Sequence, residues 1–82
     1  MRRYSPAMRF LVVYSRSRRE LLSLEQFESA DSQVAALTER EASNDDPDIE
    51  VVALRSTSFE ALKVTHGRYF VRAPEDLRPV AR

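Results

Sequence analysis

The stretch MRFLVVYSRSRRELLSLEQF, residues 8–27, contains two apolar segments joined by a short polar one. Residues 8–14 and 20–27 are rich in β-branched, aromatic and leucine residues, which predicts two strands. The connection of Ser and Arg between them is short, and this favours an antiparallel hairpin. The first segment carries apolar side chains on both faces, so we expect it to be a central strand.

Downstream, the sequence predicts helix, strand and helix. Ser29 is a helix N-cap candidate, and a modest apolar stripe extends the helix to about Ala42. A polar loop with Pro47 ends it, and residues 49–54 form a third strand. The residues 57–60, TSFE, match a capping box that starts a second helix, with the single glycine, Gly67, as its C-cap.

The predicted class is therefore α+β with the order ββαβα. A helical crossover between the second and third strands favours a three-stranded, mainly antiparallel sheet of order 2-1-3, with both helices on one face. Residues 68–72 fit either a short final strand or a further helical turn. We expect residues 1–7 to be an N-terminal extension, residues 8–72 a single domain and residues 73–82 a flexible tail.

With both helices on one face, the other face of this sheet has no cover. Leu11, Val13 and Leu21 are predicted to lie there. An exposed apolar sheet face or open edge invites association with a second copy, so the sequence predicts a homodimer formed through the sheet.

Composition excludes several chemistries. The chain has no cysteine, one histidine and one glycine, which excludes disulfides, thiolate-bound zinc, multi-histidine metal sites and glycine-rich phosphate loops. We expect no cofactor and no metal. No apolar run reaches the roughly 20 residues that a membrane span needs, and a cytoplasmic location is predicted.

Charge is balanced in total but uneven along the chain. Residues 1–19 hold six arginines and no acid, residues 20–50 hold ten acids and one base, and residues 51–82 hold six bases and three acids. Three arginines, Arg16, Arg18 and Arg19, fall in the hairpin connection. They are candidates for phosphate or nucleic-acid contact. An acidic helix face in a second copy is an alternative partner for them; its residues are Glu28, Asp31, Glu39 and Glu41.

The functional prediction is a small, non-enzymatic protein-binding or regulatory module that associates with itself. A nucleic-acid-binding accessory protein that uses the hairpin arginines is the second interpretation. A third is an enzyme or ligand-binder with a site at a dimer interface, for which His66 and Tyr69 are the candidate residues. No further catalytic group stands at a supporting spacing, so no catalytic residue is assigned.

Overall fold

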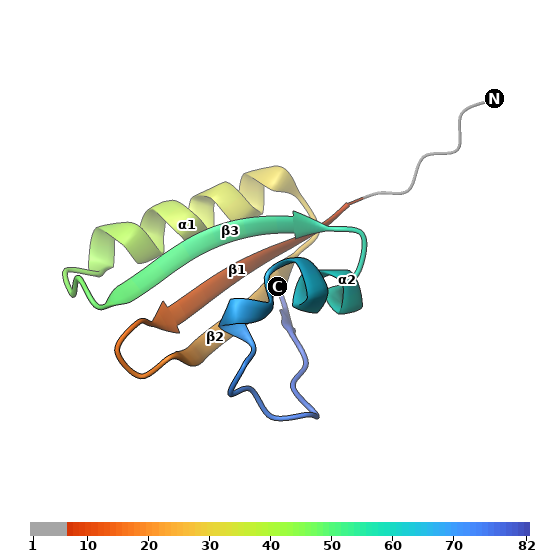
Figure 1. Cartoon of the computed structure of the whole chain (residues 1–82). Coiled ribbons are helices and arrows are strands. Elements are labelled where there is room, and N and C mark those ends of the chain that lie inside the picture. The colour runs from red at the N-terminus through yellow and green to blue at the C-terminus, as the bar shows by residue number, and fades with distance from the viewer. Residues whose placement is uncertain (1–6) are drawn as a thin grey trace.

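The computed structural model describes residues 7–82, which form one mixed sheet with a helix on each face (Figure 1). The elements, in chain order, are β1 (Met8–Ser15), β2 (Glu20–Phe27), α1 (Ala30–Ser43), β3 (Ile49–Ser56), α2 (Phe59–Thr65), the short 3-10 helix η1 (Gly67–Tyr69) and β4 (Val80–Ala81). The strand order is β3-β1-β2-β4. β1 is antiparallel to both β2 and β3, and β4 is parallel to β2. The predicted N-terminal extension lies, except for Ala7, outside the described residues.

The α+β class and the place of β1 between β2 and β3 are confirmed. The prediction of a three-stranded sheet is wrong, because β4 adds a fourth strand beside β2 and makes the sheet mixed. This strand lies in the segment 73–82 that was expected to be a flexible tail. Residues 68–72 form no strand: η1 is followed by a bend and a turn.

The two helices cover opposite faces of the sheet, so the prediction that they share one face is also wrong (Figure 1). The main core lies under α2 and η1, where Phe10, Val12 and Tyr14 of β1 pack with Leu62 of α2 and Tyr69 of η1. The odd-numbered side chains of β1 point to the other face, as strand alternation requires. α1 covers that second face, so each apolar face of β1 has its own helix.

α1 attaches to its face of the sheet largely through polar contacts. Gln33 is the buried residue of this helix, and its amide donates to the carbonyls of Phe10 in β1 and Leu54 in β3 at 3.0 and 3.1 Å. Two helical turns later, Arg40 donates to Glu25 of β2 at 2.9 Å. The apolar stripe expected on α1 is therefore turned partly away from the sheet, and its member Val34 is 56% exposed.

Both helices begin at serine caps. Ser29 accepts from the Ser32 amide at 3.1 Å, as predicted for α1. The cap of α2 is Ser58, which accepts from the Ala61 amide at 3.0 Å. The capping box predicted to start at Thr57 is therefore wrong, because the residue three after the actual cap is Ala61, which cannot complete a box. Gly67 begins η1 and does not cap α2, whose C-cap is His66.

Candidate functional site

The turn between β1 and β2 is held by the loop that precedes β3. Asp48 accepts hydrogen bonds from the Ser15 hydroxyl at 2.7 Å, the Ser17 amide at 2.8 Å and the Ser17 hydroxyl at 3.0 Å. Arg16 donates its amide to the Asp48 carbonyl and its guanidinium to the Pro47 carbonyl. The arginines of the turn therefore project from a backbone that is fixed at several points.

Beside this turn, Glu50 organises a second set of contacts. Arg68 donates to both Glu50 oxygens at 2.8 and 2.9 Å, and the Tyr69 hydroxyl donates to one of them at 2.7 Å. The Arg16 guanidinium lies 3.6 Å from the same carboxylate. Arg68 also lies over the Tyr69 ring, 4.4 Å from its centroid, and 5.7 Å from that of Tyr14. One carboxylate of β3 thus aligns two arginines and a tyrosine from two other segments, the hairpin turn and η1.

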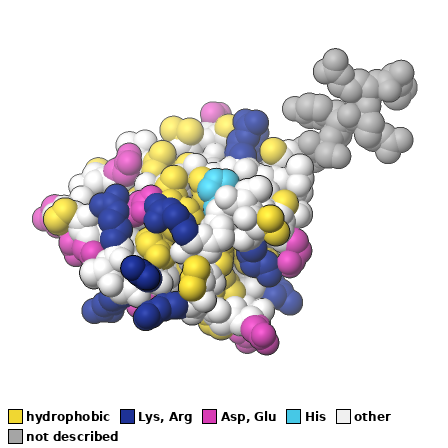
Figure 2. Space-filling model, viewed as in Figure 1, with side chains coloured by type: hydrophobic (Ala, Val, Ile, Leu, Met, Phe, Trp, Pro, Cys, Tyr) yellow, Lys and Arg dark blue, Asp and Glu magenta, His cyan; other side chains and the backbone are white. Residues whose placement is uncertain are grey.

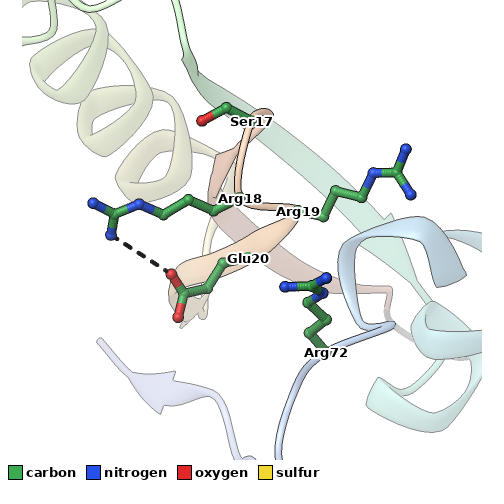
Figure 3. A pocket seen from close by; sticks show the side chains of 5 residues that line it. All are labelled: Ser17, Arg18, Arg19, Glu20 and Arg72. Atoms are coloured by element: carbon green, nitrogen blue, oxygen red, sulfur yellow. Dashed lines mark ion pairs between the residues drawn. The ribbon is translucent and has the colours of Figure 1, made fainter.

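A shallow pocket opens next to these contacts, lined by Ser17, Arg18, Arg19, Glu20 and Arg72 (Figure 3). Arg18 lies 3.9 Å from Glu20. Arg72 reaches the pocket from the chain that follows η1, across from the hairpin (Figure 3). Within residues 7–82, neither Arg19 nor Arg72 forms an ion pair.

A second pocket adjoins the first and shares Arg19 with it. Tyr14, Arg16, Arg68 and Val71 complete its lining. We call the arginines of the two pockets the arginine surface; its members are Arg16, Arg18, Arg19, Arg68 and Arg72. Figure 2 shows basic side chains gathered over the hairpin end of this face, with apolar side chains between them.

The carboxylates that hold this surface are stabilised in their charged form. The hydrogen bond from Ser15, with those from Ser17 and the charge of Arg16, lowers the pKa of Asp48. Partial burial opposes ionisation of Glu50, but the hydrogen bonds from Tyr69 and Arg68 outweigh it and lower its pKa. Burial, followed by the bond to Glu50, raises the pKa of Tyr69, while the bond to Glu50 raises that of Arg68.

The predicted hairpin arginines lie together as expected, but two further members of the surface were missed. Arg68 and Arg72 are about fifty residues away in sequence, and no local pattern connects them to the hairpin. Asp48 and Glu50, which position the surface, lie in the sequence within a polar loop and a predicted strand, and no local pattern marks their roles. The side-chain bonds that reveal their roles depend on the β1–β3 pairing.

The three residues predicted to form an uncovered face are not brought together. Leu11 is fully buried under α1, and Val13 shares its face. Leu21 pairs with Tyr14 and packs against the opposite core, because a β-bulge shifts the register between Val13 and Tyr14. The uncovered face on which the predicted self-association rested is thus occupied by α1.

His66 and Tyr69 have separate partners. The His66 Nδ1 lies 2.9 Å from the Thr65 hydroxyl, whereas the Tyr69 hydroxyl is engaged by Glu50 and Arg68. Across residues 7–82, acidic, cysteine and histidine side chains form no group of three that could hold a metal ion. In the same part of the chain no helix has the length and apolar character needed to cross a membrane.

Comparison with protein-family models, with curated proteins and with solved structures finds no match to this chain.

Proposed function

We propose that this chain is a non-enzymatic protein-binding module that docks an acidic partner through the arginine surface. The observation that carries the proposal is the convergence of five arginines from the hairpin, η1 and the segment after η1 around two adjoining pockets. Their preorganised backbone and ion pairs reduce the conformational entropy that a partner must overcome on binding. A cytoplasmic location, as predicted from the composition, belongs to the same proposal.

The composition of the surface favours a protein over a nucleic acid. Glu20 and Glu50 lie among the arginines, so the same guanidinium groups already bind carboxylates. Val71, which is 77% exposed, lines a pocket next to Arg68 and Tyr14. Arginine and tyrosine beside exposed apolar groups are typical of the residues that dominate protein interfaces. A formal net charge of zero also differs from the basic character usual for nucleic-acid-binding domains.

Nucleic acid is the second candidate, and one observation favours it. Arg19 and Arg72 line the same pocket without an ion pair among the described residues, so two guanidinium groups are available for phosphate oxygens. Phosphate contacts of this kind make affinity fall steeply with salt.

A binding experiment with matched variants tests the proposal. The probes are a labelled acidic peptide that contains leucines and a labelled single-stranded oligonucleotide, each titrated at several salt concentrations. We expect the peptide to bind, and the double variant Arg19→Ser/Arg72→Ser to weaken it at least about tenfold, a loss of roughly 1.4 kcal/mol. The control Arg78→Ser removes an exposed arginine outside the surface and is expected to leave binding unchanged.

Two results would contradict the protein-binding proposal. If the oligonucleotide binds more tightly than the peptide and its affinity falls steeply with salt, the arginine surface would instead be a nucleic-acid-binding site. Equal loss of peptide affinity in the double variant and in Arg78→Ser would show that binding follows net charge and does not require this surface.

A further inference from the structure

Among residues 7–82, the outer edge of β3 has no strand paired to it, so it is a long open strand edge. β3 has eight residues, contains no proline and pairs with β1 without a bulge. Its central residues, from Val51 to Leu54, are apolar and only partly buried. The opposite edge of the sheet differs, since β2 has a register shift and is partly covered by the short strand β4. Proteins usually protect an exposed edge by such devices, whereas β3 has no bulge or covering strand within the described residues, and its charged side chains, Glu50 and Arg55, stand toward its two ends.

The end of β3 carries positive charge that the described chain does not neutralise. Arg55 of β3 stands directly opposite Arg9 of β1, and like charges in this position destabilise a sheet. Within the described part of the chain neither arginine forms an ion pair, and the Arg9 Nε is buried without a hydrogen-bond partner. A carboxylate supplied from outside would relieve this repulsion.

The beginning of β3 offers such a carboxylate. A hollow there is lined by Glu41 of α1, by Asn44 at the C-cap of this helix and by Ile49, Glu50 and Val51 of β3. Arg16 of the hairpin turn also lines it, and its guanidinium lies 3.6 Å from the Glu50 carboxylate. Glu41 is exposed and has no ion-pair partner among residues 7–82. Ile49 and Val51 lie on the α1 face of the sheet, the same face as Arg55. Arg55, near one end of β3, and Glu41, beside the other end, thus carry opposite charges and lie on the same face of the sheet.

We propose that two copies of the chain pair their β3 edges antiparallel about a twofold axis at Val52, and that Arg55 of each copy enters the Glu41 hollow of the other. A twofold axis perpendicular to the sheet keeps each face on its own side, and the register about Val52 sets Arg55 opposite Ile49 of the second copy. No like charges stand directly opposite each other along the two strands in this register, and Arg16, the basic residue of the hollow, is already paired with Glu50. Of the arginine surface, Arg16 alone also lines the Glu41 hollow; Arg55 and Glu41, whose pairing the proposal requires, lie outside that surface.

The position of α1 is compatible with this dimer. The Gln33 amide bridges carbonyls of β1 and β3, so the helix lies over the gap between these strands. Strands are spaced about 4.8 Å apart, which puts the two α1 helices at roughly 10 Å across the axis, close to ordinary helix packing distances. Val34 precedes Glu41 by two helical turns on the same side of α1, and its exposed side chain would be covered by the second helix.

Charge reversal tests the proposal. We expect the wild-type chain to sediment in the micromolar range at twice its 9.5 kDa mass. Arg55→Glu and Glu41→Arg are each expected to raise the dimer dissociation constant at least about tenfold, and the double variant to restore it. Arg55→Glu places a glutamate opposite Arg9, which favours the folded monomer, so loss of the dimer would not reflect unfolding. Arg78→Glu is the control and is expected to remain dimeric.

The register is tested separately with cysteines, since the natural chain has none. Val52→Cys is expected to form a disulfide-linked dimer on mild oxidation, whereas Val64→Cys, on the exposed side of α2, is not. A wild-type chain that stays monomeric up to millimolar concentration would overturn the proposal. A dimer that tolerates both charge reversals, that is not restored by the double variant, or that cross-links equally through both cysteines would overturn it as well.

Discussion

The Asp48 carboxylate accepts a 2.7 Å hydrogen bond from the Ser15 hydroxyl, and this contact ties the loop before β3 to the end of β1. The same carboxylate also binds the amide of Ser17 within the turn. Because the turn carries three members of the arginine surface, Asp48 is a positioning residue for them.

Replacing Asp48 is therefore expected to loosen the turn and weaken binding at the arginine surface without unfolding the domain. Asp48→Asn keeps the size of the side chain but replaces a charged acceptor that serves three donors. We expect faster amide exchange at Ser17 and lower affinity for the acidic peptide. Asp45→Asn, an exposed change in the same loop, is the control. Equal exchange rates at Ser17 in the two variants would contradict this role for Asp48.

Acid is expected to destabilise the protein partly through Glu50. Its pKa in the folded chain is lowered, so its stabilising contribution is complete above its ordinary value of 4.5 and is lost as the pH falls through the lowered folded value. Glu50→Gln should reduce stability at neutral pH, and the difference from wild type should shrink below about pH 4.5. Urea unfolding at a series of pH values measures this difference. A difference that stays constant as the pH falls would contradict it.

Glu25 links three parts of the chain at the α1 face of the sheet. It is buried in β2, and it accepts from Arg40 of α1 at 2.9 Å and from Arg82 at 2.6 Å. The Arg82 amide also donates to the Gln26 carbonyl at 2.8 Å. These contacts hold the last residues of the chain against the edge of β2.

Removal of this carboxylate is expected to release both partners. Glu25→Ala should cost about 2 kcal/mol, since both arginines are partly exposed and recover some hydration. Arg82→Ala should cost less and should selectively increase amide exchange at Gln26 and Ala81. Denaturant unfolding and exchange measurements separate the two effects. A Glu25→Ala variant as stable as wild type would show that this buried cluster contributes nothing net to the fold.

The central position of β1 was predictable from sequence because both of its faces are apolar, while the placement of the helices was not. A helical crossover between parallel strands such as β2 and β3 is governed by a handedness rule, but the connection from β3 to α2 is free to turn to either face. α2 covers the face that α1 leaves open. The apolar pattern of α1 did not predict which side of the helix packs on the sheet, since its buried contact is made by the amide of Gln33.

The arginine surface was predictable only in its local part. Residues 16–19 are adjacent in sequence, so their clustering needs no fold. Arg68 and Arg72 join them because η1 packs Tyr69 against Tyr14, with the two rings 5.1 Å apart and nearly perpendicular. β4 was missed for a related reason: a two-residue strand has little pattern of its own and depends on the distant partner Glu25.

Arg19 gives a final prediction that links backbone strain to function. Its φ of 54° lies in the left-handed region, which is unfavourable for an arginine and costs roughly 1 kcal/mol or more. Glycine adopts this conformation freely, so Arg19→Gly is expected to make the fold about 1 kcal/mol more stable. The same change removes a guanidinium group shared by both pockets and is expected to weaken peptide binding. The midpoint temperature of thermal unfolding should therefore rise, while the affinity measured in the peptide titration should fall.

Arg18→Gly is the control, since Arg18 has no positive φ and the change is expected to lower stability. If Arg19→Gly leaves peptide affinity unchanged, the strained arginine has no role in binding.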